Sequence, residues 1–180
     1  TTAQMFRDAG IPVWDADAAV HELYAPGGAA VPAIQQAIPA AVVNRAVDRA
    51  VLKKLISEDP GVLTQLENIV HPLAAEHRAA FLAAHDDPLV VFDIPLLFET
   101  GAQDWLSSVL VVTAPADIQK ERIMARASMS EDMFHQIMSR QMPDAEKRSR
   151  ADHIIETLSL DQTRADVRKL IAQLVGQDHA

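Results

Sequence analysis

The sequence predicts a doubly wound α/β fold, with helices on both faces of a parallel sheet, from three observations. Short apolar runs alternate along the chain with longer segments of helical periodicity, which is the pattern of βαβ units. Within each run the apolar residues are consecutive rather than alternating, as expected for strands buried on both faces. The first run follows a helix that ends at Gly10, so it forms the downstream half of a βαβ unit. One compact unit is expected.

Strands are predicted at about residues 11–14, 89–92, 109–112 and 153–155. Asp48 and the pair Asp59-Pro60 mark two helix starts, because aspartate caps a first turn and proline fits its first position. The second of these helices should break or kink at Pro72. Further helices are expected over about 1–8, 115–126, 130–141 and 161–175. The stretch at about 26–85 is expected to be all helical and too long for a simple crossover, so we interpret it as a helical insertion over the substrate site.

Composition excludes several classes of protein. The chain has 180 residues, 49% of them hydrophobic, and no cysteine, so it can bury one domain but has neither disulfides nor thiolate metal sites. This composition fits a cytoplasmic location. No apolar run approaches the roughly 20 residues of a membrane helix. The net charge of −9 argues against a nucleic-acid partner, and nothing predicts the oligomeric state.

Acidic side chains follow two of the predicted strands. Asp15 and Asp17 come directly after the first strand, and Glu99 lies in the loop after the second. Ligands of open α/β sheets bind beyond the carboxyl ends of the strands, so all three are candidates for a ligand site. The alternative stays open that the aspartates only cap the next helix and that Glu99 is an exposed loop acid.

His71 precedes Pro72 at the end of an apolar helical stretch. The proline frees backbone groups and fixes the position of the ring, which favours a functional role over the alternative of a structural or solvated histidine. The other histidines lack metal-ligand spacing, so no metal site is expected in the protein.

The strongest candidates for an anion-binding site are three arginines: Arg122, Arg126 and Arg140. The first two lie four residues apart, so both guanidinium groups project from one helix face. They would repel each other unless an anion lay between them, and phosphate oxygens match their fork geometry. The segment therefore suits a small phosphorylated ligand. The alternative is a solvated basic face paired with neighbouring acids such as Glu121.

Taken together and in order, these segments resemble dephospho-CoA kinase. The resemblance rests on Asp-Ala-Asp at 15–17, His-Pro at 71–72, Asp-Ile-Pro-Leu-Leu-Phe-Glu at 93–99, the segment 119–126, and Arg-Gln-Met-Pro at 140–143. It covers residues 1 to about 155.

The resemblance implies ATP-dependent phosphorylation of the ribose 3′-hydroxyl of dephospho-CoA, the last step of coenzyme A synthesis, with ATP and Mg²⁺ as cofactors. It also implies a P-loop kinase-like three-layer α/β/α fold with a core at about 1–25, 86–120 and 150–180, a CoA-side helical insertion at 26–85 and a lid at 121–149. By the family pattern, Asp17 is the base and Arg122 stabilises the transferred phosphoryl group. Asp15, His71 and Glu99 would line the acceptor site. Arg126 and Arg140 would belong to the lid over ATP.

The sequence departs from the family pattern at two places. The family's phosphate loop and its strand are expected immediately before Thr1 and are not in this sequence, so the 180 residues alone are expected to be poorly folded and inactive. At 155–157 the chain has Ile-Glu-Thr where the family usually carries an asparagine near the adenine.

Two alternative functions stay open. One is a kinase of the same fold that acts on another nucleotide-like alcohol. The other is a non-catalytic module that binds CoA or a nucleotide.

Overall fold

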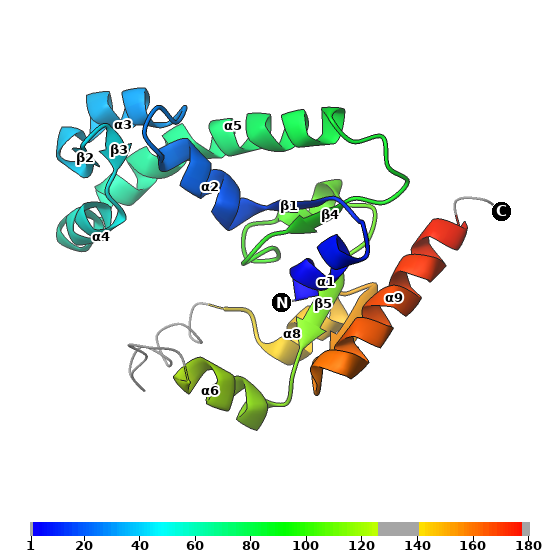
Figure 1. Ribbon diagram of the computed structural model, residues 1–180. Coiled ribbons are helices and arrows are strands. Elements are labelled where there is room, and N and C mark those ends of the chain that lie inside the picture. The colour runs from blue at the N-terminus through cyan, green and yellow to red at the C-terminus, as the bar shows by residue number, and fades with distance from the viewer. Residues whose placement is uncertain (1, 126–140, 178–180) are drawn as a thin grey trace. The chain divides into compact units, whose positions relative to one another are not determined.

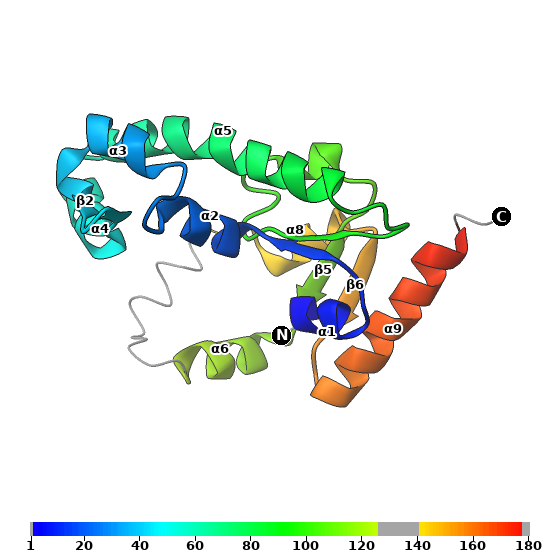
Figure 2. The same ribbon diagram turned by 45° about the horizontal axis from the view of Figure 1, so that its top comes forward.

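The structure is a computed structural model that describes residues 2–125 and 141–177. It divides into two compact units. We call Pro12–Ile94 the helical unit and Thr1–Ile11 with Pro95–Ala180 the terminal unit, and we describe each by itself (Figures 1 and 2).

The helical unit begins and ends with a strand. β1 (Val13–Asp15) pairs in parallel with β4 (Val91–Asp93), with Val13 opposite Val91 and Asp15 opposite Asp93. The elements between them are α2 (Ala16–Tyr24), α3 (Val31–Ala37), the 3₁₀ turn η1 (Pro39–Ala41), β2 (Val42–Val43), β3 (Ala46–Val47), α4 (Arg49–Glu58) and α5 (Gly61–Ala83). The parallel pairing expected from the continuous apolar runs is confirmed in this unit.

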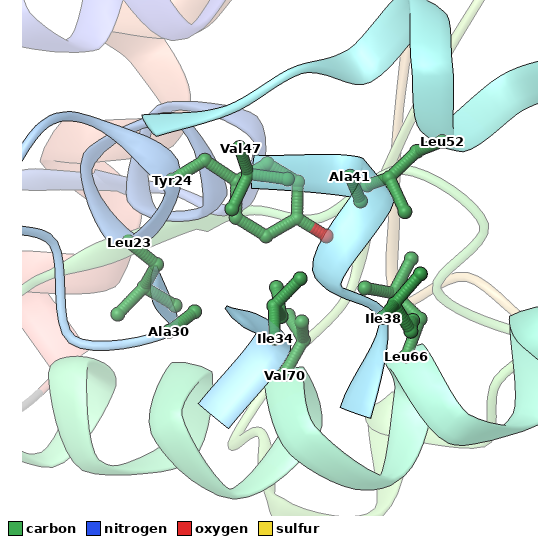
Figure 3. Packing of buried hydrophobic residues seen from close by; sticks show 10 residues of the cluster. All are labelled: Leu23, Tyr24, Ala30, Ile34, Ile38, Ala41, Val47, Leu52, Leu66 and Val70. Carbon is green, nitrogen blue, oxygen red and sulfur yellow. The ribbon is translucent and has the colours of Figure 1, made fainter. Parts of the chain in front are cut away.

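The core of the helical unit lies where α2, α3, η1 and α4 meet α5. Ile34 and Ala30 are fully buried, and the ring of Tyr24 lies among these aliphatic side chains (Figure 3). Burial raises the pKa of the Tyr24 hydroxyl, an effect that the charge of Arg49 partly offsets. The remaining members of the cluster are Leu23, Ile38, Ala41, Val47, Leu52, Leu66 and Val70.

Helix α5 is continuous past Pro72, so of the two predicted effects, a break or a kink, the break does not occur. Leu66 and Val70 before the proline pack into the core, and Leu73 after it packs against the same cluster. Tertiary packing on both sides of Pro72 thus holds the helix together despite the missing N–H. The predicted starts are confirmed: Asp48 accepts hydrogen bonds from Ala50 and Val51 at 2.8 and 3.0 Å, and Asp59 accepts one from Gly61 at 2.8 Å.

A small antiparallel hairpin, β2 with β3, interrupts the stretch that was expected to be all helical. Its two turn residues, Asn44 and Arg45, have φ angles of 50° and 65°, as a two-residue hairpin turn requires. The hairpin brings Val47 into the core beside Tyr24. The sequence signal was present as two apolar pairs flanking an asparagine, but each strand has only two residues.

The terminal unit is built on a second parallel pair, β5 (Leu110–Thr113) with β6 (His153–Glu156). α1 (Thr2–Asp8) and α9 (Leu160–Gln177) pack against each other, and α9 also contacts β6. A separate cluster contains Val111, Val109 and Phe98. The other elements are the 3₁₀ turn η2 (Ala102–Trp105), α6 (Ala116–Met124) and α8 (Asp144–Ser149).

The predicted strands are found in both units. All four strands are found within about two residues of their expected positions, and α1 ends before Gly10, whose φ of 84° only glycine adopts freely. The helix expected over 130–141 lies almost wholly outside the described residues. Within the described part of the chain, no helix combines the length and apolarity needed to cross a bilayer.

Candidate active site

Asp15 and Asp17 have different roles at the junction of β1 and α2. The Asp15 carboxylate caps α2 by accepting a 3.0 Å hydrogen bond from the Ala18 backbone N–H. Asp17 lies in the first turn of α2 and is exposed, with no hydrogen bond or ion pair to another described residue. Asp15 therefore caps α2, whereas Asp17 makes no cap hydrogen bond.

A side-chain relay fixes the strand that leads to these carboxylates. The indole N–H of Trp14 donates to His77 Nδ1 at 3.0 Å, and His77 Nε2 lies 3.1 Å from Glu22 Oε2. Because an indole N–H can only donate, Nδ1 must accept, so the proton of the neutral ring is on Nε2 and is donated to Glu22. β1, α5 and α2 are thereby joined. No sequence pattern indicates this relay, because its residues are 63 and 55 positions apart.

Asp17 opens onto a shallow hollow of about 360 Å³ in the helical unit. Its wall is mainly aliphatic, with two basic side chains, Arg49 and Lys53, on α4. The Arg49 guanidinium lies over the Tyr24 ring, 5.7 Å from its centroid. The complete lining is Asp17, Val20, Tyr24, Arg49, Leu52, Lys53, Ile56 and Leu66.

His71 is exposed on α5 and lines neither this hollow nor the one described next. It makes no hydrogen bond or ion pair to another described residue. Its place in an acceptor site stays a prediction.

Arg122 lies in a second hollow, of about 380 Å³, in the terminal unit. Its two terminal nitrogens donate to Thr157, one to Oγ1 at 2.8 Å and one to the backbone carbonyl at 2.7 Å. Thr157 in turn donates to the Thr113 carbonyl at 3.0 Å, so the guanidinium is fixed beyond the carboxyl ends of β5 and β6. Ligands of α/β sheets bind at such ends. The other lining residues are Thr2, Met5, Val112, Leu158, Ser159, Leu160 and Thr163.

Glu99 is not a free loop acid. Its Oε1 accepts a 2.7 Å hydrogen bond from the Met142 N–H and lies 3.2 Å from Lys147 Nζ, and the side chain is only 18% exposed. Burial raises the pKa of this carboxyl, but the hydrogen bonds from the Met142 and Glu99 backbone and from Lys147 outweigh burial, so the pKa is lowered. Leu96, in the same loop, has a φ of 58°, a strained conformation that is typical of ligand-binding loops.

The predicted site residues that the structure describes are divided between the two units. Asp15, Asp17 and His71 belong to the helical unit, and Glu99 and Arg122 belong to the terminal unit. Arg126 and Arg140 lie outside the described residues. No cluster of three or more potential metal ligands occurs within residues 2–125 and 141–177.

Comparison with known proteins shows the family to which the chain is similar. The family model for dephospho-CoA kinase matches residues 1–162. A dephospho-CoA kinase of Jannaschia sp. (strain CCS1) is 54% identical over 175 residues, which cover 97% of this chain and 90% of that protein. One of Ruegeria pomeroyi is 51% identical over 181 residues, covering 100% of this chain and 92% of that protein.

Two solved structures share the fold. The crystal structure of TT1252 from Thermus thermophilus has a TM-score of 0.77 and 33% identity, covering 96% of this chain and 89% of that one. The dephospho-CoA kinase from Campylobacter jejuni has a TM-score of 0.64 and 21% identity, with the same coverage. At that identity the second likeness concerns the fold alone.

Proposed function

The chain belongs to the dephospho-CoA kinase family, and we propose that Asp17 and Arg122 carry its phosphoryl transfer. The protein has the P-loop kinase-like α/β fold and is a transferase that phosphorylates dephospho-CoA with ATP. The phosphate goes to the ribose 3′-hydroxyl, which yields coenzyme A in the last step of its synthesis. The family match over residues 1–162 is the observation that carries this function.

Asp17 is proposed as the base that accepts the proton of the 3′-hydroxyl. Its carboxylate is exposed at the start of α2, beyond the end of β1, and no described residue competes for it. In phosphoryl transfer an aspartate so placed orients the nucleophile and takes its proton as the bond to phosphorus forms. The relay from Trp14 to Glu22 supports the role, because it holds the strand that leads to the base.

Arg122 is proposed to stabilise the charge that develops on the transferred phosphoryl group. It projects into the hollow beyond β5 and β6, where two hydrogen bonds to Thr157 hold the guanidinium in a fixed orientation. A donor that is already oriented needs little reorganisation when charge develops nearby. The threonine hydroxyls and mixed lining of this hollow suit ATP, which we place there. Thr157, which contacts Arg122, belongs to the segment 155–157 in which the family usually has an asparagine.

The remaining site residues are proposals from the family pattern. Asp15, His71 and Glu99 are assigned to the acceptor site, and Arg126 and Arg140 to a lid at about 121–149 that closes over ATP. Closure would exclude the water that competes with the acceptor hydroxyl. For the core and the CoA-side insertion we propose the boundaries given in the sequence analysis. We also propose a cytoplasmic location, which the absence of cysteine supports.

Magnesium enters this proposal only as the partner of ATP. Within the described residues, no group of three or more potential metal ligands lies together. We therefore assign no protein ligand to Mg²⁺ and derive no step from it.

The test is an assay of the full-length protein with ATP and dephospho-CoA, in which mass spectrometry follows coenzyme A and fragmentation locates the new phosphate. We expect one phosphate per turnover, on the ribose 3′-oxygen. We also expect kcat/KM for dephospho-CoA to exceed that for adenosine by about a hundredfold or more, because binding of the remote parts of a substrate contributes to turnover. Equal use of adenosine would favour a kinase for another alcohol. Binding of both ligands without turnover would favour the non-catalytic module.

A further inference from the structure

His77 contacts the chain on both sides of Asp17. Its Nδ1 accepts the indole N–H of Trp14 at 3.0 Å, and its Nε2 lies 3.1 Å from Glu22 Oε2. Trp14 lies in β1 before Asp17, and Glu22 lies in α2 after it. The rings of His77 and Trp14 also lie together, with their centroids 6.3 Å apart. One side chain of α5 therefore holds both the strand that leads to Asp17 and the helix that carries it.

The first turn of α2 has little packing of its own. Asp17 is exposed there, and its neighbours Ala16 and Ala18 have only a methyl group to bury. Leu23 and Tyr24, which pack into the main core cluster, lie at the other end of the helix. A helix as short as α2 is marginal without tertiary contacts. The relay supplies such contacts just before and just after the turn that carries Asp17.

The relay requires a side chain that accepts one hydrogen bond and donates another. The indole N–H of Trp14 can only donate, and Trp14 is 6% exposed, so loss of its acceptor would leave a buried donor unpaired. Glu22 accepts on the other side of the ring. Neutral histidine with its proton on Nε2 provides both groups, and so does the amide of glutamine. Leucine provides neither.

His77 lines neither of the two hollows, so it is not expected to touch a substrate. We propose that His77 is a positioning residue, which holds Asp17 where its carboxylate takes the proton of the 3′-hydroxyl. The inference rests on the proposed function and adds to it a residue that acts through the base. A small movement is enough to matter, because displacing a catalytic group by about 1 Å can slow a reaction about a hundredfold.

The first experiment compares His77→Leu with His77→Gln in the full-length protein by steady-state kinetics. We expect kcat to fall about tenfold or more in His77→Leu and to stay within about threefold of the wild type in His77→Gln, which restores both hydrogen bonds. KM for ATP should be unchanged in both variants, because the relay holds the base and not the phosphate donor. The matched control is His85→Leu, just after the end of α5, where the ring contacts Phe81. Its kcat should equal that of the wild type.

A second pair of variants separates positioning from folding. Glu22 is exposed, so Glu22→Ala releases one end of the relay without leaving a buried group unpaired. We expect its kcat to fall about threefold or more. Glu22→Gln keeps an acceptor for His77 Nε2 and should recover most of the wild-type kcat. Urea unfolding establishes that each variant is folded at the assay temperature, and Glu22→Ala replaces His77→Leu in every comparison if the latter does not fold.

A double-mutant cycle tests whether His77 acts through Asp17. The single-turnover rate of phosphoryl transfer is measured for His77→Leu in the wild-type background and in Asp17→Asn. If the histidine positions this carboxylate, the loss of about tenfold should shrink to less than about twofold once the carboxylate is gone. The same loss in both backgrounds would overturn the inference, because His77 would then support the fold or another part of the site.

The outcomes for this inference and for the proposed function are separate. If Asp17→Asn reacts at the wild-type rate, the proposed role of Asp17 fails whatever His77 does. If Asp17→Asn is slow while His77→Leu and Glu22→Ala keep the wild-type kcat, His77 is only structural and the proposed function stands. A His77→Gln variant as slow as His77→Leu would also overturn the inference, since the two hydrogen bonds would then not be the cause.

Discussion

At the scale of single residues, hydrogen bonding decides which polar side chains are free for chemistry. Asp15 and Asp17 are two positions apart, yet one caps α2 and the other has no partner in the described structure. Arg122 is held by both oxygens of Thr157, whereas Arg49 and Lys53 meet no acid there. Sequence spacing placed Asp15 and Asp17 at the end of a strand, but it left open which of them caps.

Arg122→Lys tests the role of the guanidinium fork. Lysine keeps the charge but cannot make two parallel contacts with Thr157 or with a phosphate, so we expect kcat to fall at least about tenfold. Steady-state kinetics measure the change. Arg164→Lys on α9 is the matched control, since Arg164 is a surface residue 3.4 Å from Asp161. Full activity of Arg122→Lys would leave Arg122 with a purely structural role.

Trp14→Phe tests the relay behind the carboxylates. Phenylalanine keeps a buried ring but removes the N–H that His77 accepts, and the unpaired Nδ1 should lower the free energy of unfolding by about 1–2 kcal/mol. Urea unfolding measures this difference. The same change at the exposed Trp105 should lower it by less. Equal effects at the two tryptophans would show that the relay adds nothing beyond ring packing.

At the scale of elements, the sequence predicted what depends on local pattern. Continuous apolarity located all four strands of the parallel pairs, and Asp48 and Asp59 marked two helix starts. The helix does not break at Pro72, because packing of Leu66, Val70 and Leu73 against the core outweighs one missing hydrogen bond. The hairpin β2–β3 was missed, since each strand has two residues and no periodicity to detect.

Pro72→Ala tests whether this proline is kept for function. Alanine would restore an N–H inside a continuous helix, so we expect the free energy of unfolding to rise by about 1–3 kcal/mol. If His71 belongs to the acceptor site, the same change should raise KM for dephospho-CoA by moving the ring. Thermal unfolding and steady-state kinetics give the two readouts. A less stable variant would mean that the surrounding structure requires the proline.

At the scale of the whole molecule, the family and its reaction followed from the order of motifs, which the sequence carries directly. The hollow with Arg49 and Lys53 could not be predicted, because its residues come from α2, α4 and α5 and share no motif. The His77 relay was missed for the same reason. Long-range packing created both features, and a single sequence does not record which distant side chains meet.

The stability of the protein should depend on pH through Glu99. Its folded-state pKa is lowered from the ordinary value of 4.5, so its contribution is present above that value and is lost as pH falls through the folded pKa. Glu99→Gln should therefore be less stable than the wild type at pH 7, and the difference should shrink in acid. Urea unfolding at several pH values measures it. A difference that stays constant with pH would show that the carboxylate charge is not involved.

The most direct test of the central claim is the single-turnover rate of phosphoryl transfer from bound ATP to bound dephospho-CoA in Asp17→Asn. Asparagine cannot accept the proton of the 3′-hydroxyl, so we predict a rate at least about a hundredfold below that of the wild type, with ATP affinity unchanged. Asp59→Asn, which keeps a cap on α5, should react at the wild-type rate. A rate close to that of the wild type in Asp17→Asn would contradict the account.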